Sequence, residues 1–76
     1  PDIDVDGILD RLKEKYAHQP INTLDGVKIE FDKEWVQLRK SNTEPIIRIF
    51  AESDSAATAE HLANKLIMDI KEFISE

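Results

Sequence analysis

The spacing of apolar residues along the chain predicts a helix near each end. Over residues 5–17 the apolar positions recur every three or four residues, as on one face of a helix, and Asp4 is suited to cap its start. A longer stripe of the same period predicts a second helix over about 55–74, capped by Asp54 or Ser55. The expected core positions of the two helices are Val5, Ile8, Leu9, Leu12, Tyr16, Ala59, Leu62, Ala63, Leu66, Ile67, Ile70, Phe73 and Ile74.

Between these helices, apolar and polar residues alternate with the period of two that is typical of strands. Helix, four strands and helix in this order predict an α+β fold, with a four-stranded antiparallel sheet and both helices packed on one face. The expected strands are 21–24, 27–31, 34–40 and 46–52. The sheet face toward the helices would bury Val27, Ile29, Phe31, Val36, Leu38, Ile47, Ile49 and Ala51, and the opposite face would carry Trp35, Phe50 and Ile46.

Short polar segments between the strands predict tight turns. Asp25-Gly26 has the composition of a two-residue hairpin turn, in which both residues take positive φ. A second two-residue turn at 32–33 would set Ile29 opposite Val36 in the next strand. This register pairs apolar residues with apolar residues across the strands, which supports it.

The composition confines the chain to a few classes of protein. Its 76 residues, 41% of them hydrophobic, predict one domain (residues 1–76) with one small core, and an opening Pro1 in place of methionine suggests a part excised from a longer protein. The absence of cysteine excludes disulfides, zinc–thiolate sites and cysteine nucleophiles. A net charge of -6 disfavours nucleic acid and anionic membranes as partners. No apolar run reaches transmembrane length and no secretory leader pattern is present, so we expect a cytoplasmic protein.

The densest group of polar side chains lies at 39–48, around the expected turn 41–45 between the last two strands. A tight turn directs successive backbone N–H groups inward and forms a concavity that suits an anion. Arg39 offers a planar fork for two phosphate oxygens, and it would share a sheet face with Arg48, diagonally across the hairpin. Residue types alone nevertheless favour the simpler interpretation, an ordinary polar hairpin loop flanked by arginines. The neutral donors that the turn adds are Ser41, Asn42 and Thr43.

Other candidate sites are weaker. Asp2–Gly7 matches the first half of a calcium-binding loop, but Lys13 stands where such a loop needs a glutamate, so we interpret it as an acidic helix start. His18 and His61 are far apart in sequence and have no partners at metal-ligand or catalytic-triad spacing. No pair of carboxylates converges in a sheltered position, so the sequence indicates no general acid–base site and no metal site.

Residues 39–48 resemble the phosphate-binding loop of the α-D-phosphohexomutase family, which has the pattern R-x-S-(N or G)-T-E-P-x-x-R. The upstream Asp25-Gly26-Val27-Lys28-Ile29, Trp35-Val36, and Ala51-Glu52 before the long helix also match, so the resemblance covers essentially the whole chain. It implies the C-terminal domain of a four-domain enzyme, with a TATA-binding-protein-like α+β fold. The parent enzyme would interconvert 1-phospho and 6-phospho sugars. The residue sequence of the loop most resembles that of phosphoglucosamine mutases, with phosphomannomutase/phosphoglucomutase as the alternative.

The resemblance also implies a role for each residue of the loop, namely holding the substrate phosphate that is not being transferred. The active-site phosphoserine and the Mg2+ site would lie in the other domains, so we expect no catalytic residue and no cofactor here, and an inactive isolated fragment. The expected partners are a phosphosugar and the other domains of the same chain. The implied phosphate ligands are Arg39, Ser41, Asn42 and Thr43, and the implied supporting residues are Arg48, Lys40, Glu44 and Pro45.

Two hypotheses from other classes stay open at this point. The chain could be a stand-alone module that binds an anionic ligand or an acidic peptide through the same loop. It could instead be an interaction domain that binds a partner protein through Trp35 and Phe50 on the outer sheet face.

Overall fold

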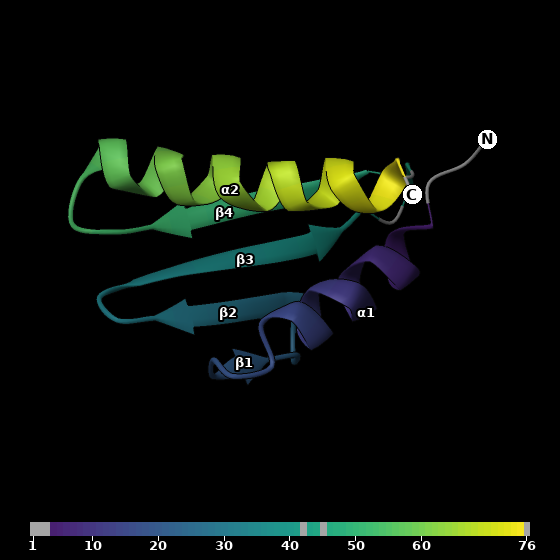
Figure 1. Cartoon of the computed structure of the whole chain (residues 1–76), viewed down its shortest axis with the longest axis horizontal. Coiled ribbons are helices and arrows are strands. Elements are labelled where there is room, and N and C mark those ends of the chain that lie inside the picture. Colours follow the sequence, from purple (N-terminus) through teal and green to yellow (C-terminus); the bar gives the residue numbers. More distant parts are fainter. Residues whose placement is uncertain (1–3, 42, 45, 76) are drawn as a thin grey trace.

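The computed structural model describes residues 4–41, 43–44 and 46–75 as an α+β fold (Figure 1). Its four strands form one antiparallel sheet in the order β1-β2-β3-β4, so β4 lies at an edge. This confirms the predicted fold class and order of elements. The elements are α1 (Val5–Lys15), β1 (Ile21–Asn22), β2 (Val27–Phe31), β3 (Glu34–Lys40), β4 (Ile47–Glu52) and α2 (Ala56–Ile74).

Side chains just before each helix satisfy the first backbone N–H groups of that helix. The Asp4 carboxylate accepts a hydrogen bond from the Gly7 N–H at 3.0 Å. Ser55 and Thr58 form a capping box, in which each side chain accepts from the backbone N–H of the other. The expected cap at Asp4 is therefore confirmed, and Ser55 rather than Asp54 caps α2. Helix α1 ends before the expected residue 17, because the backbone of Tyr16 leaves helical conformation while its ring enters the core.

The turn between β2 and β3 has the predicted register. Phe31 pairs with Glu34 across the turn, and Ile29 pairs with Val36 farther along. Lys33 takes a φ of 70°, the left-handed conformation that one residue of so short a connection must adopt. Apolar residues of β2 and β3 therefore face the helices together, as expected.

The predicted two-residue hairpin at Asp25-Gly26 is wrong. Strand β1 pairs only through Ile21 and Asn22, and a loop of residues 23–26 follows it. The Asn22 side chain accepts a hydrogen bond from the Leu24 N–H at 2.9 Å, which turns the chain away from the sheet earlier than the alternation suggested. Of the two expected positive φ values, only that of Gly26 is found, at 73°.

Both helices cover the same face of the sheet, as predicted, and one apolar core lies between them. Its buried members come from α1, β2, β3 and α2, and four of the most deeply buried side chains are Leu12, Ile29, Leu38 and Leu66. Burying these side chains is the main favourable term for folding in a chain of this size. In Figure 1, α2 runs along β4, and α1 lies on the side of β1 and β2.

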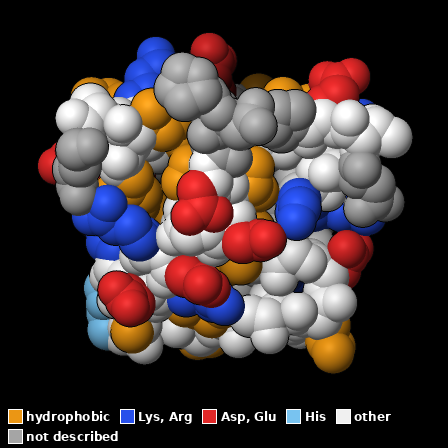
Figure 2. Space-filling view, turned by 90° about the vertical axis from the view of Figure 1, so that its right-hand side faces the viewer, with side chains coloured by type: hydrophobic (Ala, Val, Ile, Leu, Met, Phe, Trp, Pro, Cys, Tyr) orange, Lys and Arg blue, Asp and Glu red, His pale blue; other side chains and the backbone are white. Residues whose placement is uncertain are grey.

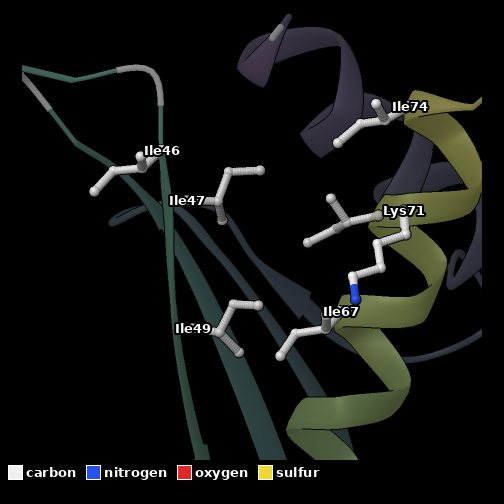
Figure 3. Close-up of a pocket in the computed structure, with 7 residues that line it drawn as sticks. Ile46, Ile47, Ile49, Ile67, Lys71 and Ile74 are labelled. Atoms are coloured by element: carbon white, nitrogen blue, oxygen red, sulfur yellow. The ribbon is translucent and has the colours of Figure 1, made fainter.

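The apolar stripe of α2 extends beyond the core, so two of its expected core residues are wrong. Ile67 is 36% exposed and Ile74 is 51% exposed. Together with residues at the edge strand β4, they line an apolar hollow, which is drawn in Figure 3. The residues contributed from this edge are Ile46, Ile47 and Ile49. No further strand lies beyond β4 in the described part of the chain to cover these side chains.

One carboxylate lies inside the interface between the two helices. Asp69 of α2 is only 7% exposed, and it accepts hydrogen bonds from the Tyr16 hydroxyl at 2.5 Å and from Lys15 Nζ at 2.6 Å. The sequence pattern did not reveal this buried position, because Asp69 interrupts the apolar stripe. Its two hydrogen bonds join the C-terminal end of α1 to α2.

Candidate functional site

The predicted phosphate-binding loop joins the end of β3 to the start of β4, on the side of the molecule that faces the viewer in Figure 2. Ser41 N–H donates to the Ile46 carbonyl at 3.2 Å, and this bond closes the base of the loop. Ile46 N–H donates to the Glu44 carbonyl at 2.8 Å. The Thr43 N–H lies 3.4 Å from Ser41 Oγ, so the two hydroxyl-bearing residues are held close together.

Arg39 and Arg48 lie directly opposite each other on β3 and β4. The expectation of a diagonal pair is wrong, because the connection extends to residue 46 and β4 begins only at Ile47. Both side chains project from the outer sheet face and are exposed. Like charges in directly opposed positions repel each other and weaken the pairing of two strands.

The two arginines border a shallow hollow of about 270 Å³ beside the loop. Two of the predicted loop residues, Ser41 and Thr43, also line it. The hollow has a cationic side, contributed by the strands, and a hydroxyl side, contributed by the loop. Its lining residues are Arg39, Lys40, Ser41, Thr43, Arg48 and Phe50.

Arg39 is held in place by the loop between β1 and β2. Its Nε lies 3.3 Å from Oδ1 of Asp25, in an ion pair whose two side chains are each about half exposed or more (49% and 65%). Gln37, which shares the outer face with Arg39, donates from Nε2 to the Asp25 carbonyl at 2.7 Å. Asp25 therefore contacts the outer face of β3 through both its carboxylate and its backbone.

Lys40 is engaged elsewhere. Its Nζ lies 3.1 Å from the carboxylate of Asp6 in the first turn of α1, on the opposite side of the sheet from Arg39. Glu44 is exposed, and no ion pair of its carboxylate is found among the described residues. Lys40 lines part of the hollow, but its ammonium group pairs with Asp6 of α1.

The structure thus brings together Arg39, Ser41, Thr43 and Arg48, while Asn42 and Pro45 lie outside the described residues. The sequence analysis did not assign Phe50 to this site, although the alternation of β4 places it on the same face as Arg48. The contact of Asp25 with this site was not predicted either, although Asp25 belongs to the upstream segment that matches the family. The contact between Asp25 and Arg39 depends on a loop whose conformation was predicted incorrectly.

The described residues were also compared with the requirements of a metal site, a membrane span and a second phosphate site. Within the described residues no group of three or more His, Asp or Glu side chains could hold a metal ion, and the carboxylate of Asp4 serves as a helix cap. No helix among them is long and apolar enough to cross a membrane. The hollow in Figure 3 is lined by isoleucines and Lys71 and offers no hydroxyl or amide side chains to a sugar phosphate.

Comparison with known proteins identifies the family. Residues 4–68 match the family model described as "Phosphoglucomutase/phosphomannomutase, C-terminal domain". The chain belongs to this family. The resemblance based on the loop at 39–48 is thereby confirmed, because the matched region includes the complete loop and both of its strands.

Curated relatives agree with this assignment to the phosphohexomutase C-terminal domains. A "Probable phosphoglucosamine mutase" of Methanopyrus kandleri is 39% identical over 66 residues, which are 87% of this chain and 14% of the relative. A "Phosphoglucosamine/phosphogalactosamine mutase" of Sulfurisphaera tokodaii is 40% identical over 76 residues (97% of this chain, 16% of the relative). A "Phosphomannomutase" of Methanocaldococcus jannaschii is 32% identical over 59 residues (78% and 13%). The chain therefore spans about a seventh of the length of these relatives.

Proposed function

We propose that this chain is the domain of a phosphohexomutase that binds the substrate phosphate not being transferred, and that the parent enzyme interconverts 1-phospho and 6-phospho sugars. The family assignment supports a mutase as the parent, since the matched relatives carry mutase names. The direct opposition of Arg39 and Arg48 is the structural observation on which the proposal rests. A bound dianion between these cations would attract each of them and so offset their mutual repulsion.

The proposed site binds phosphate through direct protein contacts. Arg39 supplies a planar fork for two oxygens, and the hydroxyls of Ser41 and Thr43 supply neutral donors beside it. Arg48 adds positive charge from the wall of the hollow, and we include Asn42 as a ligand by its match to the family pattern. A set of hydrogen-bond donors of this kind accepts either phosphate of a sugar that must turn around between the two half-reactions.

Chemistry on the transferred phosphate belongs to other parts of the proposed parent enzyme. The family resemblance implies that the active-site phosphoserine and Mg2+ lie in the other domains. We therefore assign no step of phosphoryl transfer to this chain. Its contribution would be to orient the sugar by its distal phosphate, which converts binding energy into correct alignment.

We favour phosphoglucosamine mutase as the parent, with phosphomannomutase/phosphoglucomutase as the second candidate. Several matched relatives carry the former name, and a "Phosphoglucomutase/phosphomannomutase" of Thermococcus kodakarensis is 54% identical over a shorter region of 48 residues. The described loop contacts fit a phosphate and include no group that would distinguish an amino sugar from a hexose. Assays of the full-length enzyme with glucosamine 6-phosphate and mannose 6-phosphate separate these candidates.

The partners that follow from this proposal are a phosphosugar and the other domains of the same chain. The matched relatives are much longer than this chain, so most of each relative lies outside the matched region. Phe50 and Ile46, 44% and 42% exposed, flank the loop and offer apolar surface to a neighbouring domain. We infer that domain contacts cover these side chains in the parent enzyme.

Titration of the 15N-labelled chain with glucose 6-phosphate tests the proposed function. We expect shifts centred on the backbone amides of 39–44 and Arg48, with a dissociation constant in the millimolar range because the rest of the sugar site is missing. Glucose without phosphate is the matched control, and it should leave these amides unshifted.

Each alternative function predicts a different outcome of this titration. A stand-alone anion-binding module would show an affinity far tighter than millimolar. A pure interaction domain would show no shifts with the sugar phosphate. Either result would contradict the proposed function, as would shifts centred away from the loop.

Replacing Lys40 with methionine should change phosphate affinity by less than about threefold, because its ammonium group is paired with Asp6 on the helix-covered side of the sheet, away from Arg39. The same substitution should lower the free energy of unfolding by no more than about 1 kcal/mol, as expected for an exposed ion pair. Phosphate titration and urea unfolding measure the two effects. A tenfold or greater loss of affinity would show that Lys40 leaves Asp6 to bind the phosphate directly.

A further inference from the structure

Asp25 is an acidic residue beside the proposed anion site, and its position needs an explanation. Its carboxylate contacts Arg39, the principal proposed ligand, through Nε at 3.3 Å. A negative charge beside a phosphate ligand would ordinarily oppose phosphate binding. The contact is nonetheless built into the fold, because several features hold the loop 23–26 against β3.

Gly26 allows the loop to come this close. Its φ of 73° favours glycine, and a Cβ on this residue would lie 2.3 Å from the Leu38 carbonyl oxygen. The same Cβ would lie 3.2 Å from Cα of Arg39. The backbone of Gly26 therefore lies directly against the backbone of β3 beside Arg39. The hydrogen bond from Gln37 to the Asp25 carbonyl holds the preceding residue of the loop.

We propose that Asp25 is a positioning residue, which holds the Nε edge of the Arg39 guanidinium so that its terminal nitrogens face the phosphate. A guanidinium has five N–H donors in one plane, so one edge can pair with a carboxylate while another edge binds two phosphate oxygens. Arg39 forms its ion pair with Asp25 through Nε. This inference rests on the proposed function, because it assigns Asp25 a role in that same phosphate site.

A purely electrostatic role and a positioning role predict opposite changes in phosphate affinity when the charge of Asp25 is removed. If Asp25 acted only through its charge, removing it would strengthen phosphate binding. If Asp25 positions Arg39, removing it frees a long side chain that must be ordered again when phosphate binds, and binding weakens. The direction of the change in affinity therefore decides between the two explanations.

Asp25→Asn is the variant for this test, with Asp32→Asn as the matched control. Both substitutions remove one carboxylate from an exposed turn residue, but Asp32 lies at the other end of β2, in the turn that leads to β3. We expect Asp25→Asn to raise the dissociation constant for inorganic phosphate about two- to fivefold, the scale of one exposed ion pair. Asp32→Asn should leave that constant unchanged or slightly lower.

NMR of the Arg39 side chain supplies a readout that a merely structural role would not change. In the wild-type chain the Nε–Hε signal of Arg39 should show slowed exchange with water, because the Asp25 carboxylate lies 3.3 Å from that nitrogen. In Asp25→Asn that protection should be lost while the backbone amide shifts of the strands stay in place. Unchanged Nε–Hε exchange would overturn the proposal.

The phosphate titration separates failure of this inference from failure of the proposed function. If wild type binds phosphate at the loop and Asp25→Asn binds equally or more tightly, Asp25 is not a positioning residue, while the proposed function stands. If wild type shows no shifts with phosphate at the loop, the proposed function fails and this inference fails with it.

Discussion

Alanine in place of Arg39 is expected to lower kcat/KM of the full-length mutase by roughly 10- to 150-fold. A charge-assisted hydrogen bond contributes about 1.5–3 kcal/mol, and each 1.4 kcal/mol corresponds to about a factor of ten. Arg39 is the residue for which the largest effect is expected, because it matches a ligand position of the family pattern, borders the hollow and pairs with Asp25. Steady-state kinetics with the sugar phosphate substrate measure the loss.

One control variant keeps the charge at this position, and a second removes an arginine outside the site. Arg39→Lys keeps the charge but loses the planar fork, so it should recover only part of the activity. Arg11→Ala removes the same side chain from α1, where the guanidinium lies 4.4 Å from the centre of the Phe73 ring. Its kcat/KM should stay within about threefold of wild type, as expected for a change outside the site. An unchanged kcat/KM in Arg39→Ala would refute the assigned role.

The alternation of β2 and β3 was sufficient to predict the centre of this fold. Ile29 and Val36 face each other because any other register would turn one of the two apolar faces to water. The helices followed from stripes of apolar residues together with a capping residue, as at Asp4. These features depend on the spacing of apolar residues and on capping residue types, both of which can be recognised in the sequence.

Features that depend on contacts between distant segments were not predictable in the same way. The loop 23–26 turns early because of the Asn22 side chain, which a comparison with common two-residue turns overlooks. Because the conformation of this loop was predicted incorrectly, the contact between Asp25 and Arg39 was not predicted. The direct opposition of Arg39 and Arg48 likewise depended on where β4 begins, which composition does not determine.

The identity of the site was more accessible than its geometry. The pattern of residues 39–48 indicated a phosphate-binding loop, and the family match supports that reading of the segment. No residue type in the pattern, however, tells which cations are already neutralised within the fold. The structure shows which cation already has an anionic partner: Lys40 pairs with Asp6 of α1 on the helix-covered side of the sheet. Arg48 lies on the wall of the hollow.

Replacing Asp69 with alanine should lower the free energy of unfolding by about 1.5–3 kcal/mol at pH 7. Removal of this carboxylate leaves the buried Tyr16 hydroxyl without its acceptor, and a hydrogen bond to a charged group has this magnitude. Lys15 adds little, because its side chain is 43% exposed and can turn to water. Urea unfolding measures the change. Asp10→Ala is the control: its exposed pair with Lys13 should change stability by less than about 0.5 kcal/mol.

The same cluster makes stability depend on pH in the alkaline range. Burial and the hydrogen bond to Asp69 raise the pKa of Tyr16, and the hydrogen bond to Asp69 raises the pKa of Lys15. A raised pKa in the folded state means that folding favours the protonated form. The stabilisation is therefore complete below the ordinary values of about 10 for both groups and is lost as the pH rises above them.

Asp69→Ala should therefore lose stability less steeply than wild type between about pH 9 and pH 11, because part of the cause of both shifts is gone. Urea unfolding across this range measures the two slopes, and Asp10→Ala should follow the wild-type slope. Equal slopes in wild type and Asp69→Ala would show that other groups govern alkaline unfolding. The comparison isolates the cluster, because a general rise in negative charge at high pH acts on all three proteins alike.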